Sequence, residues 1–245
     1  MNALKSELTK LLTLRSTWIT FVVAILILQI PVVVLSFTVT EPMALDFEGL
    51  LLAEMLYVFI MAYFGASIGR DLQFKLNAQA MLTQKSRSSW IFARVFWQNF
   101  FALAGLILAV LLGAALATIL PNLSVEFTNF QDLGATALKS VVLLNLGIGF
   151  AMLTRSTAAG MAIPLAQALV LDNLLVLAST KVSALKYLLF MSPTLRAGQL
   201  GYDNGAPRGF GVDQFQPDWF NALVLCAWLV LMVLLAVWSN KRDVR

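Results

Sequence analysis

The chain has 245 residues, of which 60% are hydrophobic and only 12% are charged, and its formal net charge is +4. A soluble domain is nearer to half apolar and a quarter charged, so this composition excludes an ordinary soluble protein and favours one that lies in lipid. There is no histidine and only one cysteine, Cys226, which excludes a histidine metal site, a histidine catalytic dyad and an intramolecular disulfide.

The first 16 residues predict an amphipathic helix on the membrane surface. Lys5, Glu7 and Lys10 fall on its polar faces. Its apolar face carries leucines at helical spacing: Leu4, Leu8, Leu11 and Leu12. The apolar run that follows is longer than the core of a signal peptide and lacks a small-residue cleavage site, so we expect an uncleaved anchor.

Six apolar runs predict six transmembrane helices, because each is long enough to cross ~30 Å of hydrocarbon. They are continuous rather than alternating, which favours helices over a β-barrel. Pro31 predicts a kink in the first. We therefore expect an all-α integral membrane protein with a single transmembrane domain over residues 1–245. The runs cover residues 18–37, 50–68, 97–120, 135–153, 158–179 and 220–238.

Lysine and arginine set the expected orientation. If the N-terminus is cytoplasmic, the inner segments carry twelve of these residues and the outer segments five. We therefore expect both termini in the cytoplasm.

Two connections have patterns of their own. Inside, Asp71–Leu82 lacks Gly and Pro, which predicts a short cytoplasmic helix: either a solvated linker or a docking helix for a soluble partner. Outside, Val182–Met191 is apolar but too short to cross, and Ser192-Pro193 then offers an N-cap and a first helical residue. Short re-entrant-like helices are expected there, followed by a flexible loop over Gly201–Gly211.

The sequence lacks a G-x-x-x-x-G-K-[ST] phosphate loop, an H-E-x-x-H zinc motif and a G-x-S-x-G elbow. We therefore expect no enzyme site, no metal and no cofactor on this chain. The glycines Gly65 and Gly69 form a G-x-x-x-G pattern that permits close helix contact, either within the chain or between two chains.

Charged residues inside spans are candidates for function. Asp172, with Gln167 and Asn173 nearby, could line a translocation path or lock a protein interface; alternatively, the carboxylate simply bonds a neighbouring helix. Glu54 lies nearer the outer surface, where a structural role is favoured. Lys139 is expected to extend outward to the headgroups.

Three stretches, together with the six spans, resemble the membrane-spanning permeases of type-2 ABC transporters, a class that includes bacterial drug and peptide exporters. The first resembles the opening surface helix of that family, the second its turn between spans four and five, and the third its outer segment before the last span. They are LKSELTK (4–10) with LRSTW (14–18), RSTAA (155–159), and YL (187–188) with SPT (192–194) and AGQ (197–199).

The resemblance implies that two permeases, identical or paralogous, dock on two separate cytoplasmic ATPase subunits that bind ATP and Mg. The segment from Asp71 would be the coupling helix. Many relatives have a Glu followed by a Gly-Thr pair there, whereas this chain has Asp71 and then Lys75-Leu76-Asn77. The expected coupling residues are Asp71, Leu72, Phe74, Lys75 and Leu76.

The resemblance further implies export of a drug-like, peptide or lipid-like substrate across a bacterial cytoplasmic membrane, with no nucleic-acid partner. Two other hypotheses stay open. One is a secondary transporter or channel that uses Asp172 as its ion site. The other is a membrane subunit that transports nothing.

Overall fold

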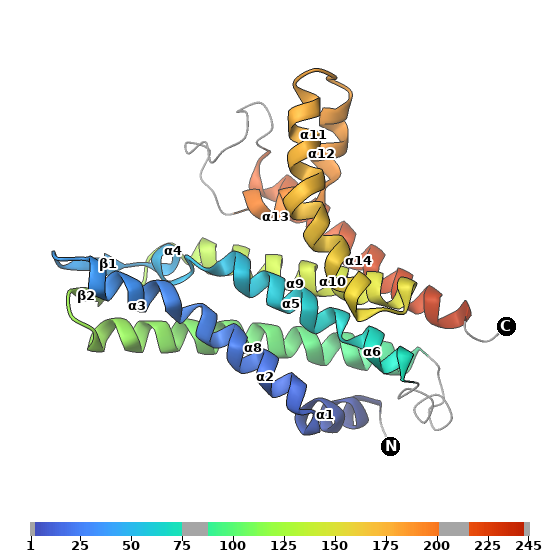
Figure 1. Ribbon diagram of the computed structural model, residues 1–245, viewed down its shortest axis with the longest axis horizontal. Coiled ribbons are helices and arrows are strands. Elements are labelled where there is room, and N and C mark those ends of the chain that lie inside the picture. Colours follow the sequence, from blue (N-terminus) through green and yellow to red (C-terminus); the bar gives the residue numbers. More distant parts are fainter. Residues whose placement is uncertain (1–2, 75–87, 201–215, 243–245) are drawn as a thin grey trace.

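The computed structural model describes residues 3–74, 88–200 and 216–242. Within these ranges, six helical segments are long and apolar enough to cross a membrane, and each overlaps one predicted run (Figure 1). The predicted all-α membrane class with six spans is confirmed. The segments are Arg15–Thr38, Glu54–Gln73, Ser89–Ile119, Phe130–Thr154, Thr157–Ser179 and Asp218–Asn240.

The chain begins with a short helix and a broken first span. Helix α1 (Ala3–Thr13) precedes α2 (Arg15–Ile27) and α3 (Gln29–Thr38), and the break between the last two falls at Leu28. Pro31 lies three residues further on. Its nitrogen has no hydrogen for the carbonyl of Ile27, so the helix cannot continue regularly through this point. The predicted kink is therefore present, one turn before the proline.

Spans two and three differ from their predicted bounds. Span two begins at Glu54, not at residue 50, because Asp46 caps a separate short helix, α4 (Phe47–Leu50), by accepting a 2.9 Å hydrogen bond from the Gly49 amide. It consists of α5 (Glu54–Ala66) and α6 (Ile68–Gln73). Span three, α8 (Ser89–Ile119), starts eight residues before the predicted position and takes in Arg94, which was expected in a loop.

A parallel two-stranded ladder, which the sequence did not predict, joins two connections. Strand β1 (Met43–Leu45) pairs with β2 (Leu123–Val125), with Met43 opposite Leu123. Each strand follows an odd-numbered span. Spans one and three cross in the same direction. The chain therefore leaves both spans in the same direction, and the two strands that follow run parallel.

The second half of the chain contains a long central helix, a broken fifth span and a final span. Ser192 caps α13 by accepting a 3.3 Å hydrogen bond from the Leu195 amide, and Pro193 is the first helical residue, both as predicted. Residues 201–211, the expected flexible loop, lie outside the described ranges. The elements are α9 (Phe130–Thr154), α10 (Thr157–Ala166), η1 (Gln167–Leu171), α11 (Asp172–Ser179), α12 (Leu185–Met191), α13 (Pro193–Gln199) and α14 (Asp218–Arg242).

Helix α9 is the centre of the bundle and packs against α5, α8, α10 and α14. Two glycines permit its closest contact, with α5. A Cβ at Gly65 would lie 2.0 Å from the Leu144 carbonyl oxygen, and one at Gly147 would lie 2.2 Å from that of Ala62. The G-x-x-x-G pattern therefore serves packing within the chain.

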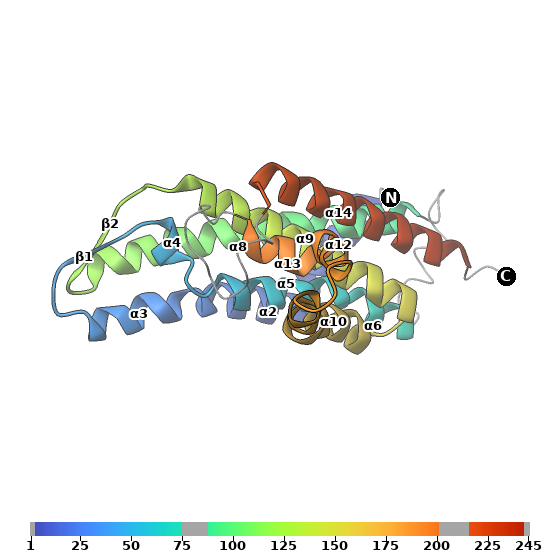
Figure 2. The same cartoon turned by 90° about the horizontal axis from the view of Figure 1, so that it is seen from above.

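The two ends of the bundle are distinct. Figures 1 and 2 show α1, α6 and the last turns of α14 at one end, and β1, β2 and α4 at the other. We call these the terminal end and the distal end. Because the chain crosses an even number of times, α1 and the last turns of α14 should lie at the same end of the bundle, and they do.

Candidate functional site

Four charged side chains from three helices meet at the terminal end. Lys10 Nζ of α1 lies 2.7 Å from Asp71 Oδ2 of α6, and Arg94 Nη2 of α8 lies 3.4 Å from the same oxygen. Arg94 Nη1 lies 3.6 Å from Glu7 Oε2. The side chains of Asp71 and Arg94 are each only 1% exposed. These four residues, which we call the terminal charge cluster, carry no net charge and bind the surface helix to spans two and three.

Neighbouring polar groups complete the attachment. The Arg94 guanidinium lies 3.3 Å from Ser67 Oγ, to which it donates, and the Trp97 indole N–H donates to the Leu4 carbonyl over 2.9 Å. Burial raises the pKa of the Glu7 carboxyl, although the charges of Arg94 and Lys10 oppose this rise. Asp71 is the nearer partner of both cations, since Lys10 and Arg94 lie closer to it than Arg94 does to Glu7.

The residues expected in the coupling helix have different positions. Asp71 is buried and pairs with Lys10 of α1 and Arg94 of α8, and its role in coupling stays a prediction. Leu72 is half-buried against the core. Phe74, by contrast, is 68% exposed and free to meet a partner. Lys75 and Leu76 lie outside the described residues, as does the rest of the expected helix.

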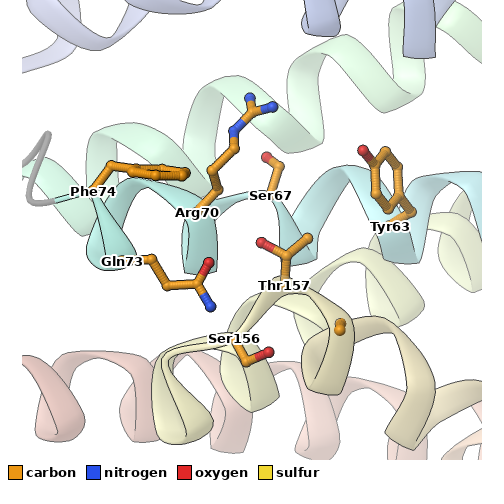
Figure 3. A pocket seen from close by; sticks show the side chains of 8 residues that line it. Tyr63, Ser67, Arg70, Gln73, Phe74, Ser156 and Thr157 are labelled. Carbon is orange, nitrogen blue, oxygen red and sulfur yellow. The ribbon is translucent and has the colours of Figure 1, made fainter.

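A cavity of about 300 Å³ opens beside Phe74. Figure 3 shows Gln73 at the end of α6 and the following Phe74 on one side, and Ser156 and Thr157 at the start of α10 on the other. The guanidinium of Arg70 points away from the start of α10 and donates to Ser16 Oγ of α2 over 2.8 Å. The exposed lining of the cavity is mostly apolar and has little charge directed into it, which suits contact with a protein surface more than capture of an ion.

The turn that forms one wall of the cavity is tightly built. Arg155 has φ 54°, a left-handed conformation that ends α9, and Ser156 caps α10 by accepting from the Ala159 amide. A Cβ at Gly69 would lie 2.6 Å from the Thr157 nitrogen, so α6 touches the backbone of the turn. The end of span two is therefore fixed both to α1 and to the turn between spans four and five.

Asp172 is the centre of a second buried site. Its carboxylate is 4% exposed and accepts hydrogen bonds from Ser192 Oγ, at 2.8 and 2.9 Å to its two oxygens, and from Thr194 Oγ1. Gln167 Nε2 lies 3.4 Å from Ser192 Oγ. Asn173 does not join them, since its amide donates to the Leu169 carbonyl of η1. Of the three predicted residues, the structure therefore brings Gln167 and Asp172 together.

A third buried group joins spans two and four near the distal end. Lys139 Nζ lies 2.8 Å from Glu54 Oε1, and Thr136 donates to the other oxygen of the same carboxylate. Lys139 is only 3% exposed, so the expectation that it extends outward is wrong. The sequence held the signal: each of these apolar runs carries one charge of opposite sign toward its outer end, and such charges favour pairing over contact with lipid.

Removing Lys139 alone should be costly. Lys139→Met leaves the Glu54 carboxylate with only a hydroxyl donor, and we expect the free energy of unfolding to fall by about 3 kcal/mol. Adding Glu54→Gln should restore most of this loss, because no charge then remains unpaired. Thermal unfolding in detergent measures both, and Lys5→Met, on the exposed side of α1, is the control. Equal losses in the single and double variants would contradict the pairing.

The fold and these sites together define a multi-pass α-helical membrane protein whose spans are joined by buried ion pairs and hydrogen-bonded carboxylates. Residues 19–245 match the family described as proteins of unknown function (DUF2705), and the chain belongs to this family. No curated protein and no solved structure matches the chain.

Proposed function

We propose that this chain is the membrane-spanning permease subunit of an ATP-driven ABC exporter in a bacterial cytoplasmic membrane, with both termini in the cytoplasm. It moves a drug-like, peptide or lipid-like substrate outward. It holds no ATPase site of its own. Two copies of a separate cytoplasmic subunit bind ATP and Mg, and a second permease, identical or paralogous, completes the membrane unit.

The observation that carries the proposal is the attachment of α6. Its last residues are bound to α1 through the terminal charge cluster and to the turn before α10 through Gly69. A force applied just beyond Phe74 would reach the surface helix and spans two, three and five together. A permease driven by an external motor needs such a junction, because motion at the cytoplasmic face must change the packing of several spans at once.

The placement of Phe74 supports the docking of a partner there. An exposed aromatic side chain beside a mostly apolar cavity is a typical anchor in protein interfaces. The positive-inside bias puts this end in the cytoplasm, where a soluble ATPase can reach it. The alternative in which Asp172 is an ion site draws less support, because hydroxyl donors occupy both of its carboxylate oxygens.

The test is purification of the tagged chain from its native membrane. We expect a subunit with a phosphate-loop motif to co-purify and the complex, in liposomes, to hydrolyse ATP and move substrate. Transport by the chain alone on an ion gradient would overturn the proposal. Reconstituted complex that binds the ATPase but moves none of the three substrate classes would favour a subunit that transports nothing.

Phe74→Ala tests the docking position. Loss of an aromatic anchor should weaken ATPase binding about tenfold or more, while insertion into the membrane is unchanged. Phe37→Ala is the matched control, since Phe37 is 82% exposed but lies on α3 toward the distal end. Affinity is measured by titrating the purified ATPase onto the permease in nanodiscs. Equal affinities for both variants would contradict docking at α6.

A further inference from the structure

The fifth span does not stay with the bundle along its whole length. Helices α11 and α12 form a hairpin, which we call the arm (residues 172–191), and Figure 1 shows it standing away from the other spans. Val176 and Leu189 of the arm form a small separate core together with Leu195 of α13. Within the described chain, α11 packs mainly on α12 and η1, whereas α10 packs on α9 and α5.

Two irregularities lie where the arm leaves α10. Pro164 is inside that helix and has no N–H for the carbonyl of Gly160. Next comes η1, one turn of π-helix over Gln167–Leu171, in which no residue is buried. Sharp changes of helix direction typically occur at prolines and π-turns. The base of the arm therefore has little packing and weakened backbone bonding, the properties of a hinge.

The buried hydrogen bonds of Asp172 hold this base. Asp172 is the first residue of α11, and its donors Ser192 and Thr194 lie where α12 passes into α13. Helix α13 itself is fixed to the bundle: it packs on α9 and α14, and Arg196 donates to Asn221 of α14 over 3.2 Å. The carboxylate thus ties the start of α11 to the start of α13.

We propose that the arm is a hinged element with a held and a released position, that η1 is the hinge, and that the bonds from Asp172 to Ser192 and Thr194 are the latch. The inference does not depend on an ATPase, since every group in it belongs to this chain. The carboxylate suits a latch because hydrogen bonds to a charged group are strong when buried. On release, water can replace the two hydroxyl donors, so the held state remains reversible.

The latch is reinforced at two further points. One is the hydrogen bond that Gln167 of η1 donates to Ser192 Oγ over 3.4 Å. At the other, the Trp228 indole N–H of α14 donates to the carbonyl of Met191, the last residue of α12, over 2.7 Å. This bond ties the end of the arm to the bundle but leaves α11 free to turn about η1. Loss of Asp172 should therefore release α11 first, and loss of Trp228 should have a smaller effect on it.

The experiment measures the position of the arm by spin labels in the otherwise unaltered chain. Cys226 is exposed on α14 and takes one label, and Lys181→Cys at the tip of the arm takes the other. Double electron–electron resonance in nanodiscs should give one narrow distance distribution. Asp172→Ala should add a second distance, with the released population raised about tenfold or more, the factor expected for a lost charged hydrogen bond.

Matched variants separate the latch from general damage. Asn173→Ala changes the next residue, whose side chain bonds the Leu169 carbonyl of η1 rather than Ser192 or Thr194, and should leave the single distance unchanged. Thr194→Val removes one donor, keeps the cap at Ser192 and should give a smaller released population. If Asp172→Ala does not fold, Thr194→Val still tests the latch. One unchanged distance in both Asp172→Ala and Thr194→Val would overturn the proposal, as would equal release in Asn173→Ala.

Discussion

Arg94→Ala is expected to destabilise the protein by about 3–5 kcal/mol and to free the surface helix. The substitution leaves Asp71 and Glu7 buried with Lys10 as the sole cation of the cluster, and an uncompensated buried charge is costly. Thermal unfolding in detergent measures the loss of stability. Limited trypsin digestion reports the helix directly, because cleavage after Lys5 and Lys10 should accelerate when α1 detaches.

Arg15→Ala is the control for this prediction. Arg15 is exposed at the start of α2, and its removal should change stability by no more than about 0.5 kcal/mol. Wild-type stability and wild-type digestion of Arg94→Ala would contradict a role for the cluster in holding α1. If Arg94→Ala melts at the wild-type temperature but is digested fast, the cluster holds α1 in place without stabilising the rest of the bundle.

Glu7 should show a pH signature within the same cluster. Burial raises its pKa above 4.5, so between pH 4.5 and the raised value the folded state holds a proton that the unfolded state releases. The contribution of Glu7 to stability is then greatest below pH 4.5 and falls as the pH rises through the raised value. Glu7→Gln should remove this part of the pH dependence and should cost less stability than Arg94→Ala.

Gly147→Ala is expected to force α5 and α9 apart. The new Cβ would lie 2.2 Å from the carbonyl oxygen of Ala62, a backbone atom that no change of rotamer can move. Overpacking of this kind costs about 1–3 kcal/mol, and more where the backbone must shift. Size-exclusion chromatography after graded heating measures the loss of folded protein.

Gly134→Ala supplies a control in the same helix. A Cβ at Gly134 has no heavy atom within 4 Å, so this change should be neutral or stabilising by up to about 1 kcal/mol, because alanine is the better helix former. If Gly147→Ala and Gly134→Ala lose the same amount of folded protein on heating, the close contact between α5 and α9 does not determine the stability of the central helix.

Hydrophobic runs were sufficient to predict the six spans, because a backbone in lipid must bond to itself and an apolar run of this length has few alternatives. The kink before Pro31 and the cap at Ser192 were also predictable, since each depends on local backbone chemistry. The exact helix ends were not: span three gains Ser89–Phe96 because Arg94 finds its partners on two other helices.

The charged residues show most clearly which features the sequence predicts and which depend on packing between helices. The sequence by itself determined that Glu54, Lys139 and Asp172 lie in or beside apolar spans, where a charge must find a partner. Only the tertiary structure decided the partners, because each lies 20 or more positions away along the chain: Asp172 with Ser192, Glu54 with Lys139, and Asp71 with Lys10. Lipid fixes how many helices cross, whereas packing between helices fixes which of their polar groups meet.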